Sequence, residues 1–391
     1  MARLAGLRAL SLAIPFRSVF RHASAVRSET ATVWVQAISG RGVTGHGEGC
    51  PREYVTGESL GQALSFVDRL RSSVLSRIHD PASLSDWIRD NEEDIDANPA
   101  AWCAVELALL DLFSRESDQS VEAALGIPEL TGEYQYSAVL GDSGDESFAT
   151  QLGEYISAGF HDFKIKVSGD HTRDSARIRT LMNSADGKAR VRLDANNLWC
   201  SPEEAIRYIG GLGCRIFAVE EPLEAGDYDG AAAVSRALGI PVIVDESFLR
   251  IGQLDELASD PGRWILNLRV SKLGGLLRSL AIVKAARAAG LNIIIGAQVG
   301  ETSLLTRAAL TLARQSRDIL VAQEGAFGTL LLEEDISRNS LMFGAGGRLN
   351  VGGRFECTPG FGLHLDTVRI ERWSGVPRPG LATKSGAGTD D

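Results

Sequence analysis

Charged and amide side chains recur at nearly even intervals through the second half of this 391-residue chain, each within or just after a short β-branched run. They are Lys164 and Lys166 in FKIKV, Asp194 in RLDAN, Glu220 in AVEEP, Asp245 in IVDES, Arg269 in LNLRV, Gln298 in GAQVG and Glu324 in VAQEG. Each run predicts a strand, so polar residues fall at the ends of successive strands. Where such strands close into a barrel, these positions build the active site.

Three of these residues are acids on consecutive predicted strands: Asp194, Glu220 and Asp245. If the strands are neighbours, the three carboxylates lie close together and repel one another unless a cation sits between them. Oxygen ligands alone suit Mg²⁺. Any one acid could instead cap a helix or pair with a base, but three in register predict a Mg²⁺ site.

The elements that must position these residues alternate along the chain. Three β-like segments and a helical stretch from Glu58 to about Gly126 predict an α+β domain over residues 1–130. Eight strands alternating with helices over residues 131–354 predict a (β/α)8 barrel. We expect residues 355–375 to return to the first domain and residues 376–391 to form a tail.

The first residues allow two interpretations, because they carry several arginines and no acid before Glu29. They could open a transit or signal peptide, or they could form a first strand over 6–14. We favour the strand, since the apolar stretch is short and Pro15 breaks it, and since TATVWVQAI and VTGHGEG follow as hairpin partners.

Five motifs together resemble the mandelate racemase and muconate lactonizing enzyme group of the enolase superfamily. They are K-x-K at 164–166, DAN-xx-W at 194–199, E-E-P at 220–222, D-E-S at 245–247 and K-x-G-G at 272–275. The resemblance covers nearly the whole chain. It implies a modified TIM-type barrel under an α+β capping domain, with Mg²⁺ held by Asp194, Glu220 and Asp245. It also implies removal of a proton α to a substrate carboxylate.

In this family the residue that matches Lys166 is the base, and the resemblance implies the same role here. A lysine base must lose its own proton first, and a neighbouring Lys164 and the metal would lower its pKa. Lys164 could equally bind the substrate carboxylate. We expect Asn196 and Glu246 to support the metal ligands from behind.

The chain departs from its relatives with two opposed lysines, because Arg269 stands where the second lysine is expected. A guanidinium stays protonated, so Arg269 is a fixed cation and a poor base. Lys272 lies nearby, but we place it in the following loop, on the opposite face from Arg269. No histidine lies at the end of the sixth, seventh or eighth predicted strand. We therefore predict one-base chemistry, as a lyase or cycloisomerase.

Two other functions remain open. The sequence pattern is also similar to that of dipeptide epimerases. Those enzymes place a D-x-D motif after the eighth strand to hold an α-ammonium, whereas this chain has QEGAFGT there. Glu324, alone there, could donate a proton, bind a substrate amine or hydroxyl, or pair with Arg269 or Lys272. The third possibility is a relative that binds metal and carboxylate without catalysis, in which Arg269 marks lost chemistry.

We expect substrate selection to depend on the capping-domain loops at 16–26 and 50–57. Arg21, Arg52 and Tyr54 in those loops are predicted substrate-binding residues, and Gln298 is predicted to join them from the barrel. Each loop residue could instead be an ordinary solvated side chain.

Composition limits the partners and the compartment. With 40 basic and 51 acidic residues the net charge is -11, which disfavours nucleic acid, and no apolar run is long enough to span a membrane. Five scattered cysteines without a C-x-x-C pair indicate reduced thiols in the cytoplasm. We expect a small carboxylate substrate and a homo-oligomer.

Overall fold

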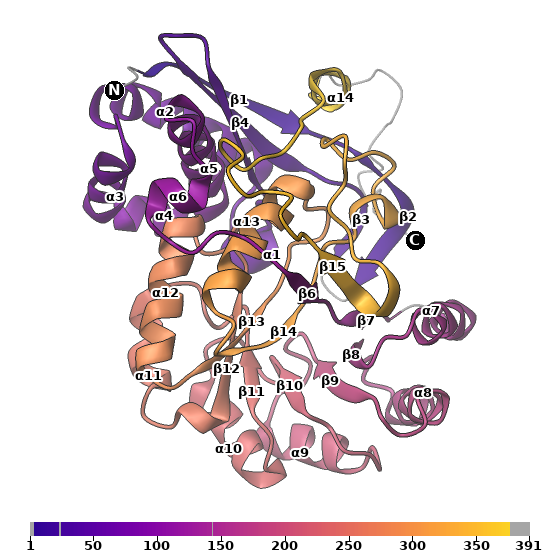
Figure 1. Ribbon diagram of the computed structural model, residues 1–391. Coiled ribbons are helices and arrows are strands. Elements are labelled where there is room, and N and C mark those ends of the chain that lie inside the picture. Colours follow the sequence, from indigo (N-terminus) through magenta and orange to yellow (C-terminus); the bar gives the residue numbers. More distant parts are fainter. Residues whose placement is uncertain (1–3, 23–24, 143, 376–391) are drawn as a thin grey trace, which may run out of the picture.

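Eight parallel strands form a curled sheet beneath an α+β capping domain, so the predicted fold class is confirmed (Figure 1). The computed structural model describes residues 4–22, 25–142 and 144–375, including side chains except those at 20–26. The strands are β7 (Ala138–Leu140), β8 (Asp162–Lys166), β9 (Arg190–Asp194), β10 (Ala218–Glu220), β11 (Val242–Val244), β12 (Trp264–Leu268), β13 (Asn292–Ile295) and β14 (Leu320–Gln323). Each strand pairs with the next along the chain.

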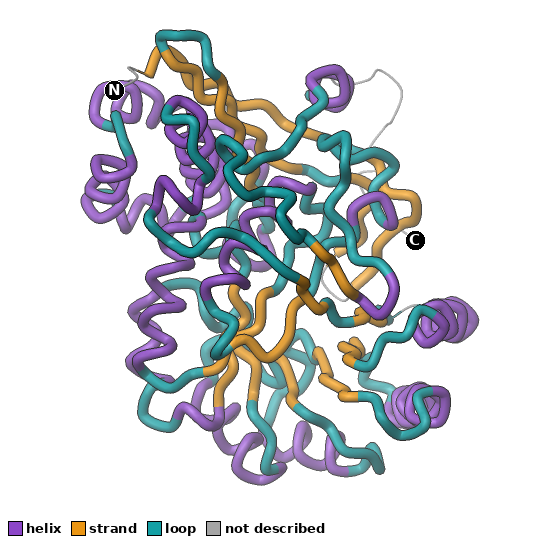
Figure 2. Tube along the Cα trace, viewed as in Figure 1, coloured by secondary structure: helices purple, strands orange, loops and turns teal. Residues whose placement is uncertain are grey.

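The two edge strands of this sheet meet, which closes the barrel. The amide of Ser137, just before β7, donates a hydrogen bond to the carbonyl of Gln323 at the end of β14 (2.8 Å). Figure 2 shows helices surrounding the strands. They are α7 (Asp145–Ser157), α8 (His171–Ser184), α9 (Pro202–Gly210), α10 (Tyr228–Leu238), α11 (Leu254–Leu257), α12 (Leu276–Ala288) and α13 (Ser303–Gln315).

The capping domain contains an antiparallel sheet of β1 (Leu4–Leu12), β4 (Thr32–Ser39) and β5 (Thr44–Gly49), in the order β1-β4-β5. This confirms the opening strand and its two partners, although the strand begins before the predicted range. β2 (Pro15–His22) and β3 (Ala25–Glu29) form a separate hairpin. The helices are α1 (Glu53–Thr56), α2 (Leu60–Arg77), α3 (Pro81–Asp90), α4 (Glu92–Ala97), α5 (Pro99–Glu116) and α6 (Val121–Leu125).

Helix α5 is buried along nearly its whole length, because it packs closely on β5. The glycines of the TGHGEG segment permit this packing. A Cβ atom added to Gly47 would lie 1.9 Å from the carbonyl oxygen of Ala104, and one added to Gly49 would lie 1.9 Å from that of Ala100. The alternate glycines of β5 therefore let sheet and helix backbones touch.

The carboxyl-terminal segment crosses back over both parts of the molecule. β15 (Arg348–Asn350) pairs with β6 (Glu133–Gln135), and α14 (Thr367–Trp373) lies beside β1, where Ala13 donates to the carbonyl of Trp373 (3.0 Å). Short 3₁₀ turns complete the fold: η1 (Ile251–Gln253), η2 (Pro261–Arg263), η3 (Gly328–Leu330) and η4 (Ala345–Gly347). No helix in the described part of the chain is long and apolar enough to cross a membrane.

The capping domain lies over the carboxyl ends of the barrel strands. The amide of Cys50 donates to the hydroxyl of Ser271 after β12 (2.8 Å), and the amide of Thr302 donates to the Glu48 carboxylate (2.9 Å). These contacts cover the end of the barrel where the predicted site residues lie. All five cysteines are free thiols, as predicted.

Candidate functional site

The polar site residues point into the barrel because of the two-residue period of a strand. Small and branched apolar side chains cluster on one face of the sheet: Ala218, Ile243, Ile265, Ile294 and Ala322. Side chains two residues apart on a strand share a face. Glu220, Asp245, Asn267 and Glu324 each follow one of these apolar residues by two positions. The face that is apolar inside the barrel therefore becomes polar at its carboxyl end.

Strand register places the predicted base beside the first two predicted metal ligands. Lys166 on β8 pairs with Asp194 on β9, and Asp194 pairs with Glu220 on β10. Asp245 follows β11, the next strand. A row of one lysine and three acids thus runs across four neighbouring strands.

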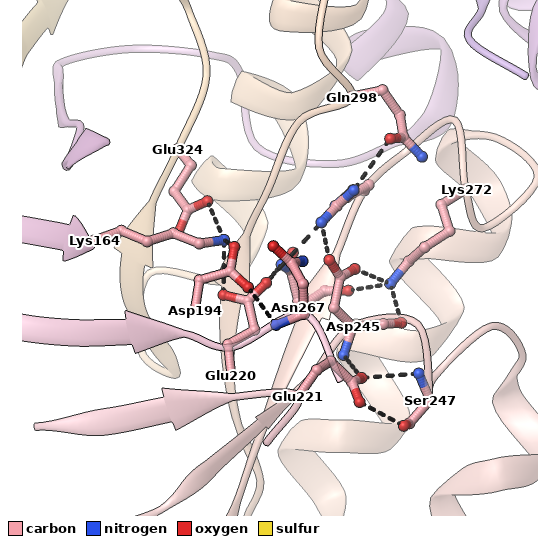
Figure 3. A network of polar contacts seen from close by, with 12 residues as sticks. Lys164, Asp194, Glu220, Glu221, Asp245, Ser247, Asn267, Lys272, Gln298 and Glu324 are labelled. Carbon is pink, nitrogen blue, oxygen red and sulfur yellow. Dashed lines mark hydrogen bonds and ion pairs between the residues drawn. The ribbon is translucent and has the colours of Figure 1, made fainter. Parts of the chain in front are cut away.

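Lys164 lies among three carboxylates (Figure 3). Its Nζ atom is 2.8 Å from Glu220 Oε2 and 3.1 Å from both Asp194 Oδ2 and Glu324 Oε2. Burial by itself lowers the pKa of Lys164, but the three carboxylates outweigh burial and the pKa is raised. Lys164 is therefore a fixed cation that holds the acids together.

Lys166 has a different environment from Lys164, although one residue separates them. Its Nζ atom donates to Asn196 Oδ1 (2.6 Å) and lies 3.1 Å from Asp194 Oδ2. Asn196, predicted to support the metal ligands, thus contacts the lysine, and its amide also donates to Asp194 Oδ1 (3.2 Å). Asn196 has a positive φ of 43°, a conformation that asparagine adopts more readily than most residues.

Asp245 is buried between two cations. Its Oδ2 atom forms an ion pair with Arg269 Nη2, and its Oδ1 atom accepts a hydrogen bond from Lys272 Nζ (2.8 Å). Lys272 is fully buried and also donates to the carbonyls of Asp245 and Asn267 (2.8 Å each). Burial and the nearby Arg269 lower the pKa of Lys272 to about 7.

The placement of Lys272 corrects our view that it lies on the opposite face from Arg269. That argument assumed an extended strand, but β12 ends at Leu268 and the chain then turns, so the two-residue period no longer applies. The K-x-G-G motif was the available signal. Gly274 and Gly275 both have positive φ, which shapes the turn that brings Lys272 back toward Asp245.

The acids have the chemistry of a Mg²⁺ site, but protein cations occupy the spaces between them. Among the described residues no group of three acid, histidine or cysteine side chains is arranged to hold a metal ion as it stands. Glu220 Oε2 and Asp245 Oδ2 accept no hydrogen bond and are balanced only by ion pairs with Lys164 and Arg269. Carboxylate oxygens of this kind suit a hard cation, and these two become available to one where Lys164 or Arg269 withdraws.

Several residues that the sequence did not single out support this row. Glu221, beside Glu220, accepts from the Ser247 amide (2.8 Å) and hydroxyl (2.7 Å) and from the Asp245 amide, and so holds the chain after β11. Asn267 donates to Glu220 Oε1 (3.0 Å). The predicted supporting residue Glu246 has a buried Oε2 atom without a hydrogen bond, and burial and nearby acids raise its pKa to about 8.

Glu324 pairs with neither Arg269 nor Lys272. Its Oε1 atom accepts from Arg192 Nη1 (2.8 Å), and its Oε2 atom accepts from Lys164 Nζ (3.1 Å). Burial alone raises the pKa of Glu324, but these two cations outweigh it and the pKa is lowered. An ionised Glu324 with both oxygens engaged is a poor proton donor.

The four predicted substrate-binding residues have different surroundings. Arg52 is fully buried and donates to carbonyls that include those of Thr30 (3.2 Å) and Val299 (2.5 Å), which argues against a substrate-binding role. Tyr54 lies on α1, with the Arg27 guanidinium 6.0 Å from its ring. Gln298 accepts from Arg269 Nη1 (3.0 Å). The Arg21 side chain is outside the described residues.

The chain belongs to the enolase superfamily, in the mandelate racemase and muconate lactonizing enzyme group. Residues 147–369 match the family model "Enolase C-terminal domain-like", and residues 8–126 match "Mandelate racemase / muconate lactonizing enzyme, N-terminal domain". The predicted family is therefore confirmed.

Curated relatives in this group are mostly epimerases and racemases. The chain is 28% identical to the L-Ala-D/L-Glu epimerase of Bacillus subtilis over 90% of this chain and 94% of that protein. It is 23% identical to the N-succinyl-L-Arg/Lys racemase of Bacillus cereus, over 85% and 89% respectively. These relatives favour the epimerase alternative over the one-base lyase or cycloisomerase that we predicted.

A solved structure shares the fold. The dipeptide epimerase of Enterococcus faecalis, complexed with Mg and the dipeptide L-Leu-L-Tyr, superposes with a TM-score of 0.81. The match has 24% identity and covers 92% of this chain and 99% of that one.

Proposed function

We propose that this protein is an isomerase in which Lys166 removes the proton α to a carboxylate and a solvent-derived proton adds to the opposite face, so that an N-acylated α-amino acid is racemised or epimerised. The observation that carries this proposal is the pairing of Lys166 with Asp194 and of Asp194 with Glu220 across adjacent strands. The amine that can take a proton is thereby held beside the acids that can hold a cation.

The protein's own residues divide the work. Lys166 takes the α-proton on its Nζ atom, which Asn196 Oδ1 and Asp194 Oδ2 orient. Lys164, kept protonated by its three carboxylates, holds Asp194 and Glu220 in place. The capping domain covers the end of the barrel through contacts such as Cys50 with Ser271, and a covered site strengthens each of these charge interactions.

Asp194, Glu220 and Asp245 would hold a Mg²⁺ ion. When bound, the ion supplies positive charge for the carboxylate oxygens that become more negative as the proton leaves. The support is the set of carboxylate oxygens without hydrogen bonds, together with the relative that was crystallised with Mg.

The substrate class follows from Glu324. Both of its oxygens are engaged by Arg192 and Lys164, so this residue offers no free carboxylate to a substrate ammonium. The relatives named for L-Ala-D/L-Glu and for N-succinyl-L-Arg/Lys share an acylated nitrogen at the centre that is inverted. We therefore propose an amino acid whose amine is acylated, and we do not expect a free α-ammonium to contribute to binding.

Arg269 supports a second candidate function, a one-base lyase or cycloisomerase. Inversion needs a proton donor on the face opposite Lys166, and a guanidinium does not exchange protons readily. In the second function Lys166 alone would act, and a leaving group or ring closure would complete the reaction.

The stereochemical outcome separates the two functions. N-acylated amino acids, dipeptides and hydroxy acids are incubated in D₂O with Mg²⁺ and the protein, and mass spectrometry and chiral chromatography follow the products. Deuterium at the α-carbon with inverted configuration supports the isomerase. Elimination or cyclisation without inversion supports the second function. No reaction with any acid would contradict both and leave a non-catalytic binding protein.

A further inference from the structure

Arg269 links a predicted metal ligand to the mouth of the barrel. Its Nη2 atom forms the ion pair with Asp245 Oδ2, and its Nη1 atom donates to Gln298 Oε1 (3.0 Å). The side chain is 12% exposed, and its Nε atom is buried without a partner. The guanidinium thus spans two groups that follow β11 and β13, the strands on either side of β12.

Asp245 has no free oxygen while this ion pair is in place. Lys272 engages Oδ1 (Figure 3). Arg269 engages Oδ2. A metal ion that binds Asp245 is repelled by both protein cations at this short range, so it binds best where one of the two withdraws.

Arg269 is the cation that can leave. Lys272 is fully buried, and three acceptors hold its Nζ atom: Asp245 Oδ1 and the carbonyls of Asp245 and Asn267. Arg269 is partly exposed and keeps Gln298 as a partner after it leaves Asp245. Displacement of Arg269 consequently leaves the buried Lys272 ammonium with all three of its acceptors.

We propose that Arg269 is an internal competitor of the divalent cation at Asp245, so that the metal enters only by displacing the guanidinium toward Gln298. This inference rests on the proposed metal site. It makes metal affinity in this chain a balance between Arg269 and the ion, and it assigns a positioning role to the arginine that replaces the second lysine.

Two substitutions separate contact competition from a simple charge effect. Arg269→Met removes the charge and the contact. Arg269→Lys keeps the charge, but its side chain is one bond shorter and has a single donor group, so it cannot span Asp245 and Gln298 together. Arg263→Met is the matched control, because Arg263 forms its ion pair with Asp260 at the opposite end of β12.

The test is calorimetric titration of the chelator-treated, full-length protein with Mg²⁺ alone, repeated for the three variants. We expect both Arg269 variants to bind Mg²⁺ about tenfold more tightly than the unmodified protein, and Arg263→Met to bind it equally well. A further readout is the melting temperature, which saturating Mg²⁺ should raise more in the Arg269 variants than in the unmodified protein.

Other outcomes overturn the inference in distinguishable ways. If Arg269→Lys binds as weakly as the unmodified protein while Arg269→Met binds more tightly, only the charge matters and there is no contact competition. If neither variant binds more tightly, Arg269 does not compete at all. If no form binds Mg²⁺, the metal site itself is contradicted, and this inference with it.

Discussion

Two lysines on one strand acquire different properties because their neighbours differ. Lys164 is enclosed by three carboxylates, whereas Lys166 contacts one carboxylate and the amide of Asn196. Both side chains face the same way, as the two-residue period requires. The division between a structural cation and a candidate base is therefore set by the acids on adjacent strands.

Glu324 tests this division at a single position. Glu324→Gln keeps the shape of the side chain but leaves Lys164 and Arg192 each short of one negative partner. Since breaking a buried ion pair leaves an uncompensated charge, we expect a loss of about 3 kcal/mol in the free energy of unfolding. Denaturant unfolding measures it.

The control for this change is Glu333→Gln, because Glu333 is exposed and its substitution should leave stability unchanged. If Glu324→Gln proved as stable as the control, the network around Lys164 would not hold the site together. The sequence alone pointed to Glu324 but not to its partners, since Arg192 lies in mid-strand where no motif marks it.

How far the site could be predicted depended on local regularity. Lys166, Asp194 and Glu220 were identified because regular strands repeat at even intervals, and the register then aligns them. Lys272 was misplaced because it follows the end of β12. Asn267 was missed because an asparagine within a strand carries no signal until its neighbour Glu220 is known.

Strand β5 and helix α5 pack backbone against backbone in the capping domain. The alternate glycines of TGHGEG leave no room for a side chain between the two backbones. From the sequence we could place this segment only as a hairpin partner of the preceding strand. The role of these glycines is evident only once α5 is placed against β5, because neither segment's sequence by itself shows which distant element it packs on.

A methyl group at Gly47 should therefore be costly. Gly47→Ala would place its Cβ atom 1.9 Å from the Ala104 carbonyl, so the helix must shift, and we expect a loss of at least about 2 kcal/mol in the free energy of unfolding. Gly61→Ala in α2 is the control, because no atom lies within 4 Å of its added Cβ and alanine favours helix. Equal stabilities of the two variants would disprove the tight contact.

The molecule as a whole is held together by contacts between segments far apart in the sequence. Arg307 on α13 forms a fully buried ion pair with Glu122 on α6 (2.8 Å), which ties the barrel to the capping domain. Alternating strands and helices predicted the barrel, and three β-like segments followed by a helical stretch predicted the α+β domain. The pairing of β6 with β15 could not be predicted, because a Gly-rich stretch hides the second strand.

His46 makes the stability of the capping domain depend on pH. Burial lowers the pKa of His46 to about 4; nearby Asp111 opposes this shift and Arg115 adds to it. As the pH falls, the His46 imidazole therefore becomes protonated near pH 6.5 in the unfolded chain but only near pH 4 in the folded chain. Stability from this group is complete above pH 6.5 and decreases as the pH falls.

Replacing His46 with glutamine separates its contribution to the pH dependence of stability from the contributions of other groups. Between pH 7 and pH 4 we expect the unmodified protein to lose up to about 3 kcal/mol more stability than His46→Gln. His79→Gln, at an exposed position, should keep the pH dependence of the unmodified protein. Parallel unfolding curves for His46→Gln and the unmodified protein would contradict the burial of a neutral imidazole.

The central claim is that Lys166, beside the carboxylates of neighbouring strands, removes an α-proton with the help of a bound cation. The most direct measurement is the exchange of the α-proton of an N-acylated amino acid in D₂O. NMR follows the substrate signal in the presence of the chelator-treated protein, before and after Mg²⁺ is added. We expect exchange only when Mg²⁺ is present. The exchange rate should fall at least about a hundredfold in Lys166→Met and stay unchanged in Lys188→Met, the control at an exposed position. Exchange that persists in Lys166→Met, or that proceeds equally without Mg²⁺, would contradict the claim.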